Sequence, residues 1–150
     1  MLVLSRNIFF YKDISLADTF ETRIYLMFIH FSIILKIFKK KGKKFDQNSY
    51  DALFHNIENN LRESGFGDVT VNKKMKDMNK LLYDILLKFE KNESNLFKLN
   101  SKLVSKYFRE LNNEKEEKYK KFESYFNDFY NFCFELSLDN MLREAINFRN

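Results

Sequence analysis

The segment IYLMFIHFSIILKIF, residues 24–38, restricts the fold more than any other part of the sequence. On a helix it has one apolar stripe, formed by Ile24, Met27, Phe28, Phe31, Ile34, Leu35 and Phe38, and its other side carries Tyr25, Ile29, Ile33 and Ile37. A helix that is apolar all round is normally central in a bundle. A membrane span needs about 20 apolar residues, and His30, Ser32 and Lys36 interrupt this shorter run. The sequence therefore predicts a central core helix.

Capping signals mark both ends of this helix. Asp18 followed by Glu21 has the spacing of a capping box, and Thr22 is a second candidate cap. At the other end, lysines favour the negative end of the helix dipole, and Gly42 can take the conformation that ends a helix. Because residues 36–44 contain no acid, a patch facing phosphate or lipid is the alternative interpretation of the lysines.

Five further helices are predicted from apolar residues at three- and four-residue spacing. They run from about residues 46–49 to Ser64, from Val71 to Phe89, from Leu96 to Leu111 after a polar break at 92–95, from Tyr119 to Leu136, and from Asn140 to Phe148 after a cap at Asp139. No run of alternating β-branched residues with hairpin turns occurs. The fold prediction is all-α, a compact bundle of about six or seven helices in a single domain over residues 1–150.

The composition excludes a disordered chain and mildly favours one class of partner. Hydrophobic residues make up 45% of the 150 residues, and proline is absent. A net charge of +5 mildly favours acidic partners such as nucleic acid, ribosomes or anionic lipid surfaces. Cys133 is the single cysteine, so an internal disulfide is excluded, and its aromatic surroundings predict a buried thiol. The first residues do not resemble a secretory signal, so a cytoplasmic location is expected.

No motif for catalysis or for a cofactor is found. Thr70 stands where a dinucleotide fingerprint that begins at Gly65 and Gly67 needs its third glycine. His30 and His55 lie on different predicted helices without metal-ligand spacing. We therefore expect no catalytic residue, no metal and no cofactor, and a protein that is not an enzyme.

The stretch LRESGFGDVTVNKKMK, residues 61–76, is called the glycine corner below. It predicts a helix stop, a tight turn and a helix start, in which both glycines take unusual dihedral angles and Asp68 or Thr70 caps the next helix. Lysines in a first helical turn are mildly disfavoured by the dipole, so either a negative partner or chance explains them. The candidate partner-binding residues are Arg62, Glu63, Gly65, Gly67, Asp68, Lys73, Lys74 and Lys76.

The helix predicted over residues 119–136 carries more apolar surface than one face can bury. Its surplus aromatic residues are Tyr125, Tyr130, Phe132 and Phe134. Two explanations are open: the helix is buried on two sides, or these side chains are apolar docking candidates for a partner.

Two ordered motifs carry a resemblance to a known family. NLRESGFGDVTVNKKMKDM, residues 60–78, resembles the signature of the ubiquinol–cytochrome c chaperone family, and FYKDISLADTFETR followed by an apolar helix resembles its first motif. The matching positions are Phe10, Tyr11, Asp13, Asp18, Thr19, Arg23, His30, Asn60, Leu61, Arg62, Glu63, Gly65, Gly67, Asp68, Val71, Lys73, Lys76 and Met78. The resemblance is strongest over residues 8–89. Ser15, Ala17, Thr22 and Asn72 depart from the pattern at turns, which puts the partner in doubt more than the fold.

This resemblance implies a non-enzymatic assembly factor for the cytochrome b subunit of the ubiquinol–cytochrome c reductase, the bc1 complex of the respiratory chain. It also implies cytochrome b as an apolar client, a small companion subunit and a contact with the ribosome. DNA is not expected as a partner. A bacterial cytoplasmic protein, peripheral at the inner face of the membrane, is the expected setting. The alternative is a basic module that binds RNA, the ribosome or a membrane surface without a cytochrome b client.

Overall fold

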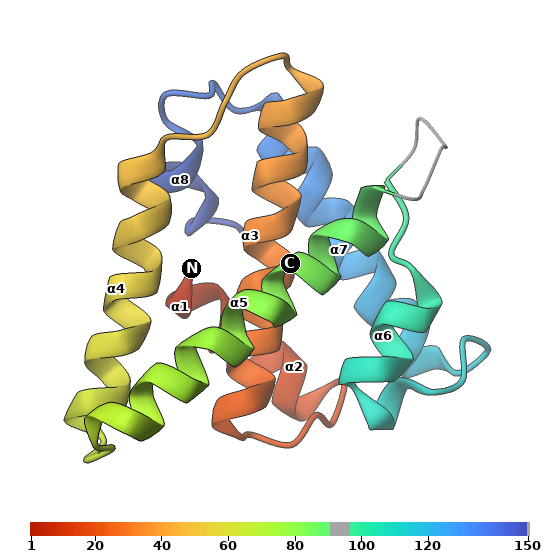
Figure 1. Ribbon diagram of the computed structural model, residues 1–150. Coiled ribbons are helices and arrows are strands. Elements are labelled where there is room, and N and C mark those ends of the chain that lie inside the picture. The colour runs from red at the N-terminus through yellow and green to blue at the C-terminus, as the bar shows by residue number, and fades with distance from the viewer. Residues whose placement is uncertain (91–96, 150) are drawn as a thin grey trace.

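Helix α3 (Phe20–Lys40) forms the centre of the molecule, as the computed structural model shows for residues 1–90 and 97–149. Helix α5 (Asp68–Glu90) crosses it on one side and α7 (Glu117–Glu135) lies on the other (Figure 1). Eleven of its residues are buried: Ile24, Leu26, Met27, Phe28, Ile29, His30, Phe31, Ser32, Ile33, Ile34 and Ile37. The predicted central helix is confirmed.

The remaining elements complete an all-α fold, and the described residues contain no strand. They are α1 (Leu2–Ser5), α2 (Ile8–Lys12), α4 (Gln47–Glu63), α6 (Ser101–Tyr107), a 3-10 turn η1 (Arg109–Leu111) and α8 (Met141–Ala145). The all-α prediction is confirmed, and α1 and α2 are short helices that the sequence did not indicate. One cluster of buried side chains extends from Leu4 to Phe148. No described helix is both long enough and apolar enough to cross a membrane.

Two predicted helices are shorter than expected. The fourth is confined to α6 and η1, because Asn100 caps α6 at the backbone nitrogens of Lys102 and Leu103 and Phe108 then adopts an extended conformation. The polar break predicted at 92–95 lies outside the described residues. The last helix begins at Met141, and its N-cap position is held by Asn140 instead of Asp139.

The start of α3 differs from the predicted capping box. Thr19 is the N-cap, and its hydroxyl accepts a hydrogen bond from the backbone nitrogen of Thr22 at 3.1 Å. Asp18 instead accepts two hydrogen bonds from Arg23, at 2.8 and 2.9 Å, which lower the pKa of its carboxyl group. The prediction that Asp18 and Glu21 form a capping box is therefore wrong, because the Asp18 carboxylate accepts its hydrogen bonds from the Arg23 side chain.

Helix α3 ends as predicted at Gly42, which has a φ of 71°. The backbone nitrogen of Lys43 donates to the carbonyl of Phe38 at 3.0 Å, closing the turn around the glycine. Ser15, one of the positions that depart from the pattern of the resemblance, also has a positive φ, 63°, a conformation that glycine adopts most readily. The chain therefore keeps this turn without the residue best suited to it.

A buried histidine joins α3 to α7. His30 is fully buried, with Nδ1 at 2.7 Å from the carbonyl of Leu26 and Nε2 at 3.1 Å from the hydroxyl of Tyr125. Because a carbonyl only accepts, Nδ1 carries the proton and Nε2 accepts from Tyr125. Burial lowers the pKa of His30 to about 3. His30 is thus a neutral core residue with both ring nitrogens engaged.

Lysines at the end of α3 bind the carboxyl ends of two other helices. Lys36 Nζ donates to the carbonyl of Phe89 at 3.1 Å, near the end of α5. Lys41 Nζ donates to the carbonyls of Phe134 and Leu136, at 2.6 and 3.2 Å, at the end of α7. Cations are stabilised there by the helix dipole and by carbonyls that lack intrahelical partners. The lysine-rich run therefore has a structural role in addition to any surface role.

We expect Lys41→Met to lower the free energy of unfolding by about 1 to 2 kcal/mol, since it removes a cation from two carbonyls and from the end of a helix dipole. The apolar part of the side chain is kept. Chemical denaturation would measure the change, and Lys43→Met, at an exposed lysine of the same run, should change stability by less than about 0.5 kcal/mol. Equal effects of the two substitutions would contradict the structural role of Lys41.

Candidate functional site

The glycine corner closes α4 with a single left-handed residue. Gly65 has a φ of 91°, as predicted. Its backbone nitrogen donates to the carbonyl of Arg62 at 2.9 Å, and that of Phe66 donates to Leu61 at 3.3 Å. This is the hydrogen-bond pattern of a Schellman motif, which needs glycine at the positive φ. The turn is therefore fixed by backbone geometry.

Gly67 does not have the unusual dihedral angle predicted for it, because Gly65 alone makes the left-handed step. The carbonyl of Gly67 accepts from the backbone nitrogen of Val71 at 2.9 Å, which puts Gly67 at the N-cap position of α5. No atom lies within 4 Å of the place where a Cβ would stand. A side chain at Gly67 is thus compatible with the turn, and Asp68 is the first residue of α5.

Arg62 ties the end of α4 to the start of α5. Its guanidinium donates to Glu58 at 2.8 and 3.2 Å and also to Asp68, and these two carboxylates raise the pKa of Arg62. Exposed pairs of this kind contribute little to stability, because solvent screens them. Two of the candidate partner-binding residues, Arg62 and Asp68, therefore pair with each other across the corner although both are exposed, and Glu63 is exposed as well.

The sequence analysis did not identify the exposed apolar side chains of the glycine corner. Phe66 is 41% exposed and Val69 is 85% exposed. The Nζ of Lys74 lies 4.9 Å from the centre of the Phe66 ring, within the range of a cation–π contact. The exposure of Phe66 could have been predicted, because Phe66 stands between two glycines, in a turn where no helix can bury it. The corner thus combines apolar and cationic groups.

The three candidate lysines of α5 do not form one continuous surface patch. Lys74 is half-buried and lines a pocket, while Lys73 and Lys76 are exposed on another side of α5. This separation follows from the 100° turn between successive helical residues.

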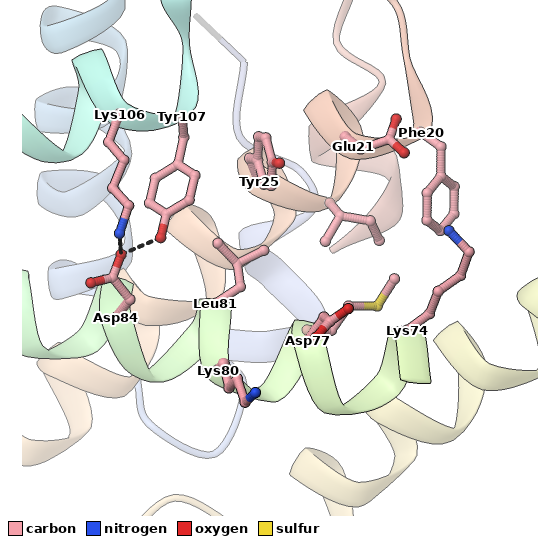
Figure 2. Close-up of a pocket in the computed structure, with 12 residues that line it drawn as sticks. Phe20, Glu21, Tyr25, Lys74, Asp77, Lys80, Leu81, Asp84, Lys106 and Tyr107 are labelled. Atoms are coloured by element: carbon pink, nitrogen blue, oxygen red, sulfur yellow. Dashed lines mark hydrogen bonds and ion pairs between the residues drawn. The ribbon is translucent and has the colours of Figure 1, made fainter. Parts of the chain in front are cut away.

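A pocket of about 500 Å³ adjoins the glycine corner and is called the α3–α5–α6 pocket (Figure 2). It is lined by Phe20, Glu21, Ile24, Tyr25, Lys74, Asp77, Met78, Lys80, Leu81, Asp84, Lys106 and Tyr107. Apolar side chains from α3 and α5 alternate with charged ones of both signs. Its volume is within the range of about 300–1,000 Å³ usual for ligand pockets. Sequence analysis could not find it, because α6 reaches α5 across more than twenty residues.

Asp84 closes one end of this pocket. It accepts from Lys106 at 2.8 Å and from the hydroxyl of Tyr107 (Figure 2). It also accepts from Lys88 at 3.1 Å. Burial alone would raise the pKa of Asp84, but these donors outweigh it and lower the pKa. Burial and the bond to Asp84 raise the pKa of Tyr107 to about 12. Neither group is therefore suited to exchange protons near neutral pH, and the cluster joins α6 to α5.

A second pocket, of about 460 Å³, lies between α1, α4 and α8. Its lining is almost wholly apolar and includes Val3, Phe31, Leu53, Ile57 and Ile146, with no charged side chain. In the part of the chain that the structure describes, no group of three or more His, Cys, Asp or Glu side chains is arranged to hold a metal ion.

The surplus aromatic residues of α7 are mostly core residues. Tyr125 is 2% exposed and Tyr130 is 6% exposed, so these two docking candidates present almost no surface to a partner. Phe132 and Phe134 are half-buried, and the Phe134 ring lies 4.8 Å from Lys41 Nζ. Burial of α7 on two sides thus explains most of its aromatic content. Cys133 is fully buried, as predicted, and burial raises its pKa to about 12.

Comparison with known proteins assigns the chain to a family. Neither the curated proteins nor the solved structures contain a significant match. The sequence model described as ubiquinol-cytochrome C chaperone matches residues 12–127, well over half of the 150 residues. The matched region contains the glycine corner, the α3–α5–α6 pocket and most of α7. The chain therefore belongs to the ubiquinol–cytochrome c chaperone family.

Proposed function

We propose that this protein is a non-enzymatic assembly factor of the bc1 complex, and that it binds newly made cytochrome b at the α3–α5–α6 pocket and the adjoining glycine corner. Family membership supports an assembly role. The observation that carries the choice of site is the exposure of two phenylalanines. Phe20, 41% exposed, lines the pocket, and Phe66, also 41% exposed, contacts Lys74, which lines the same pocket.

The chemistry of the pocket suits the end of an apolar client helix. Phe20, Tyr25 and Leu81 give the pocket an apolar lining that is only partly buried. Large aliphatic side chains of a client can be buried against it, with a gain of about 25 cal/mol per Å² of apolar area removed from water. Charged groups of both signs, including Lys74 and Asp77, line the same pocket and can bind the polar residues that flank such a helix. A client with an apolar segment and polar flanks therefore matches both parts of the lining.

The rigidity of the glycine corner favours binding. Its turn is fixed by the left-handed Gly65 and the backbone hydrogen bonds around it, and the pair between Arg62 and Asp68 joins α4 to α5. A surface that is ordered before binding loses less conformational freedom when the partner binds. Catalysis is not part of the proposal, because the polar groups that converge on the pocket, Asp84 and Tyr107, hold each other in fixed protonation states.

Site-specific crosslinking would test the client and the site together. A benzophenone amino acid in place of Phe20 or Phe66 should capture cytochrome b in cells that assemble the complex. The same probe in place of Ile8, which is 60% exposed on α2 and outside the pocket, should not. Loss of the gene should also remove the b- and c-type haem signals of the complex from the difference spectrum of membranes. Capture from all three positions, or an unchanged spectrum, would contradict the proposal.

A ribosome contact remains a second candidate, favoured by the exposed lysines of α5. Salt separates the two kinds of contact, since binding to RNA phosphates weakens steeply as salt rises and apolar burial does not. Cosedimentation with ribosomes at 50 and about 200 mM salt would measure this. The run at 36–44 contributes less than its lysine count implies, because Lys36 and Lys41 bind helix ends.

A further inference from the structure

The outer side of α5 carries a continuous exposed stripe, defined by Val69, Lys73, Lys76, Lys80, Tyr83 and Leu87. The spacing alternates between four and three residues, so all six positions lie within an arc of about 80° on the helix. Val69 is 85% exposed, Tyr83 62% and Leu87 56%, and the three lysines are also exposed. The opposite side of α5 is buried through Val71, Met78, Leu82, Ile85 and Phe89. Figure 1 shows α5 crossing the front of the molecule with no other element drawn over it.

The composition of this outer stripe is unusual for a solvated surface. Three lysines occupy its centre, apolar or aromatic side chains occupy both ends, and no acidic residue interrupts it. Asp77 and Asp84 line the α3–α5–α6 pocket, on a neighbouring side of the helix. The stripe extends over about 27 Å, since Val69 and Leu87 are 18 helical steps of 1.5 Å apart. It therefore presents a long surface that is positive at its centre and apolar at its ends.

We propose that the outer stripe of α5 lies on an anionic membrane surface. Lysines bind anionic headgroups while their methylene chains remain near the apolar boundary, and tyrosine favours the headgroup level. Exposed aliphatic side chains such as Val69 and Leu87 gain from contact with lipid, whereas RNA phosphates offer them nothing. A second copy of this chain does not fit, because two stripes of three lysines would repel each other.

This inference deepens the proposed function and rests on it for the client. Lys80 belongs to the stripe and also lines the α3–α5–α6 pocket, so the two surfaces share an edge. A protein lying on the membrane through the stripe would hold the pocket beside the lipid into which cytochrome b inserts. The membrane contact itself needs no client and can be measured alone.

Vesicle flotation would test the lysines of the stripe. The protein should bind vesicles containing phosphatidylglycerol and should not bind vesicles of phosphatidylcholine alone. The double variant Lys73→Gln/Lys76→Gln should lower partitioning into the anionic vesicles by about 10- to 30-fold. Lys80 is left intact because it lines the pocket. The matched control Lys102→Gln/Lys120→Gln removes the same charge from exposed positions outside the stripe and should bind as the parent does. Equal losses in both doubles would overturn the proposal.

A second pair of substitutions distinguishes lipid from RNA. Val69→Gln/Leu87→Gln should weaken vesicle binding severalfold, because it removes the apolar ends, and should leave binding to polyuridylate unchanged. Thermal unfolding would show that all variants remain folded. Vesicle binding that is absent in the parent, or unaffected by this double variant, would overturn the lipid assignment.

Crosslinking from Phe20 in detergent-solubilised extracts separates this inference from the proposed function. If cytochrome b is captured but the protein fails to bind anionic vesicles, the membrane contact is contradicted and the client proposal stands. Vesicle binding that depends on Lys73 and Lys76, without any capture of cytochrome b, would support the membrane contact and reject the client.

Discussion

Replacing Phe10 with alanine should lower the free energy of unfolding by about 3–5 kcal/mol, the usual cost of removing a fully buried phenylalanine. Phe10 is completely buried, and its ring centre lies 4.7 Å from that of Tyr125 and 5.8 Å from that of Phe126. The ring centres of Phe10 and His30 lie 6.0 Å apart, with the two rings nearly perpendicular. The substitution would therefore open a cavity where α2, α3 and α7 meet.

Urea denaturation of Phe10→Ala and Phe66→Ala would measure this effect against a matched substitution. Phe66 is 41% exposed, so its loss should cost less than about 1 kcal/mol. A cost below about 1.5 kcal/mol at Phe10 would show that the N-terminal segment is not packed on α3 and α7 as described. The comparison separates burial from the aromatic character that both residues share.

Lowering the pH from 7 to 5 should reduce the free energy of unfolding by about 2 kcal/mol through His30 alone. Burial lowers its folded-state pKa from an ordinary value of 6.5 to about 3. At pH 7 the imidazole is neutral in both states. Below pH 6.5 the unfolded chain binds a proton and the folded chain does not, so stability falls with pH until the folded pKa is reached.

Two variants would identify His30 as the source of this dependence. His30→Gln should abolish most of the loss between pH 7 and 5, whatever its effect on stability at pH 7. Tyr125→Phe keeps the imidazole buried, so it should keep the pH dependence while lowering stability by about 1–3 kcal/mol, because Nε2 loses its donor. A parent protein whose stability is constant from pH 7 to 5 would contradict a buried neutral His30. The window ends at pH 5 because carboxylates such as Asp84 begin to matter below it.

The two motifs of the family resemblance have different roles in the structure. Residues of the first motif mainly build the fold: Phe10 and His30 lie in the core, and Asp18 pairs with Arg23 at the start of α3. The second motif forms the exposed glycine corner. Sequence periodicity predicted the helices because apolar spacing within a helix is local. The role of Gly65 was predictable for the same reason, since a left-handed turn depends on a few adjacent residues.

Contacts between distant segments escaped prediction. The bond from Lys41 to Leu136 joins residues 95 positions apart, and Asp84 meets Lys106 across 22 positions. A lysine run has the same appearance in the sequence whether it binds a partner or the end of another helix. The α3–α5–α6 pocket depends on such long-range packing as well. The outer stripe of α5 was visible as a spacing, but only the burial of the opposite side shows that it faces solvent.

The position of α3 between α5 and α7 has a consequence for the synthesis of the protein itself. His30 meets Tyr125 only after a further 95 residues have been translated, which takes about 5–20 s at ordinary rates. During that time α3, apolar on every side, lacks the helix that covers its second face. The chain thus passes through a stage in which its own central helix is exposed, and nascent chains that stop before α7 should be prone to aggregate.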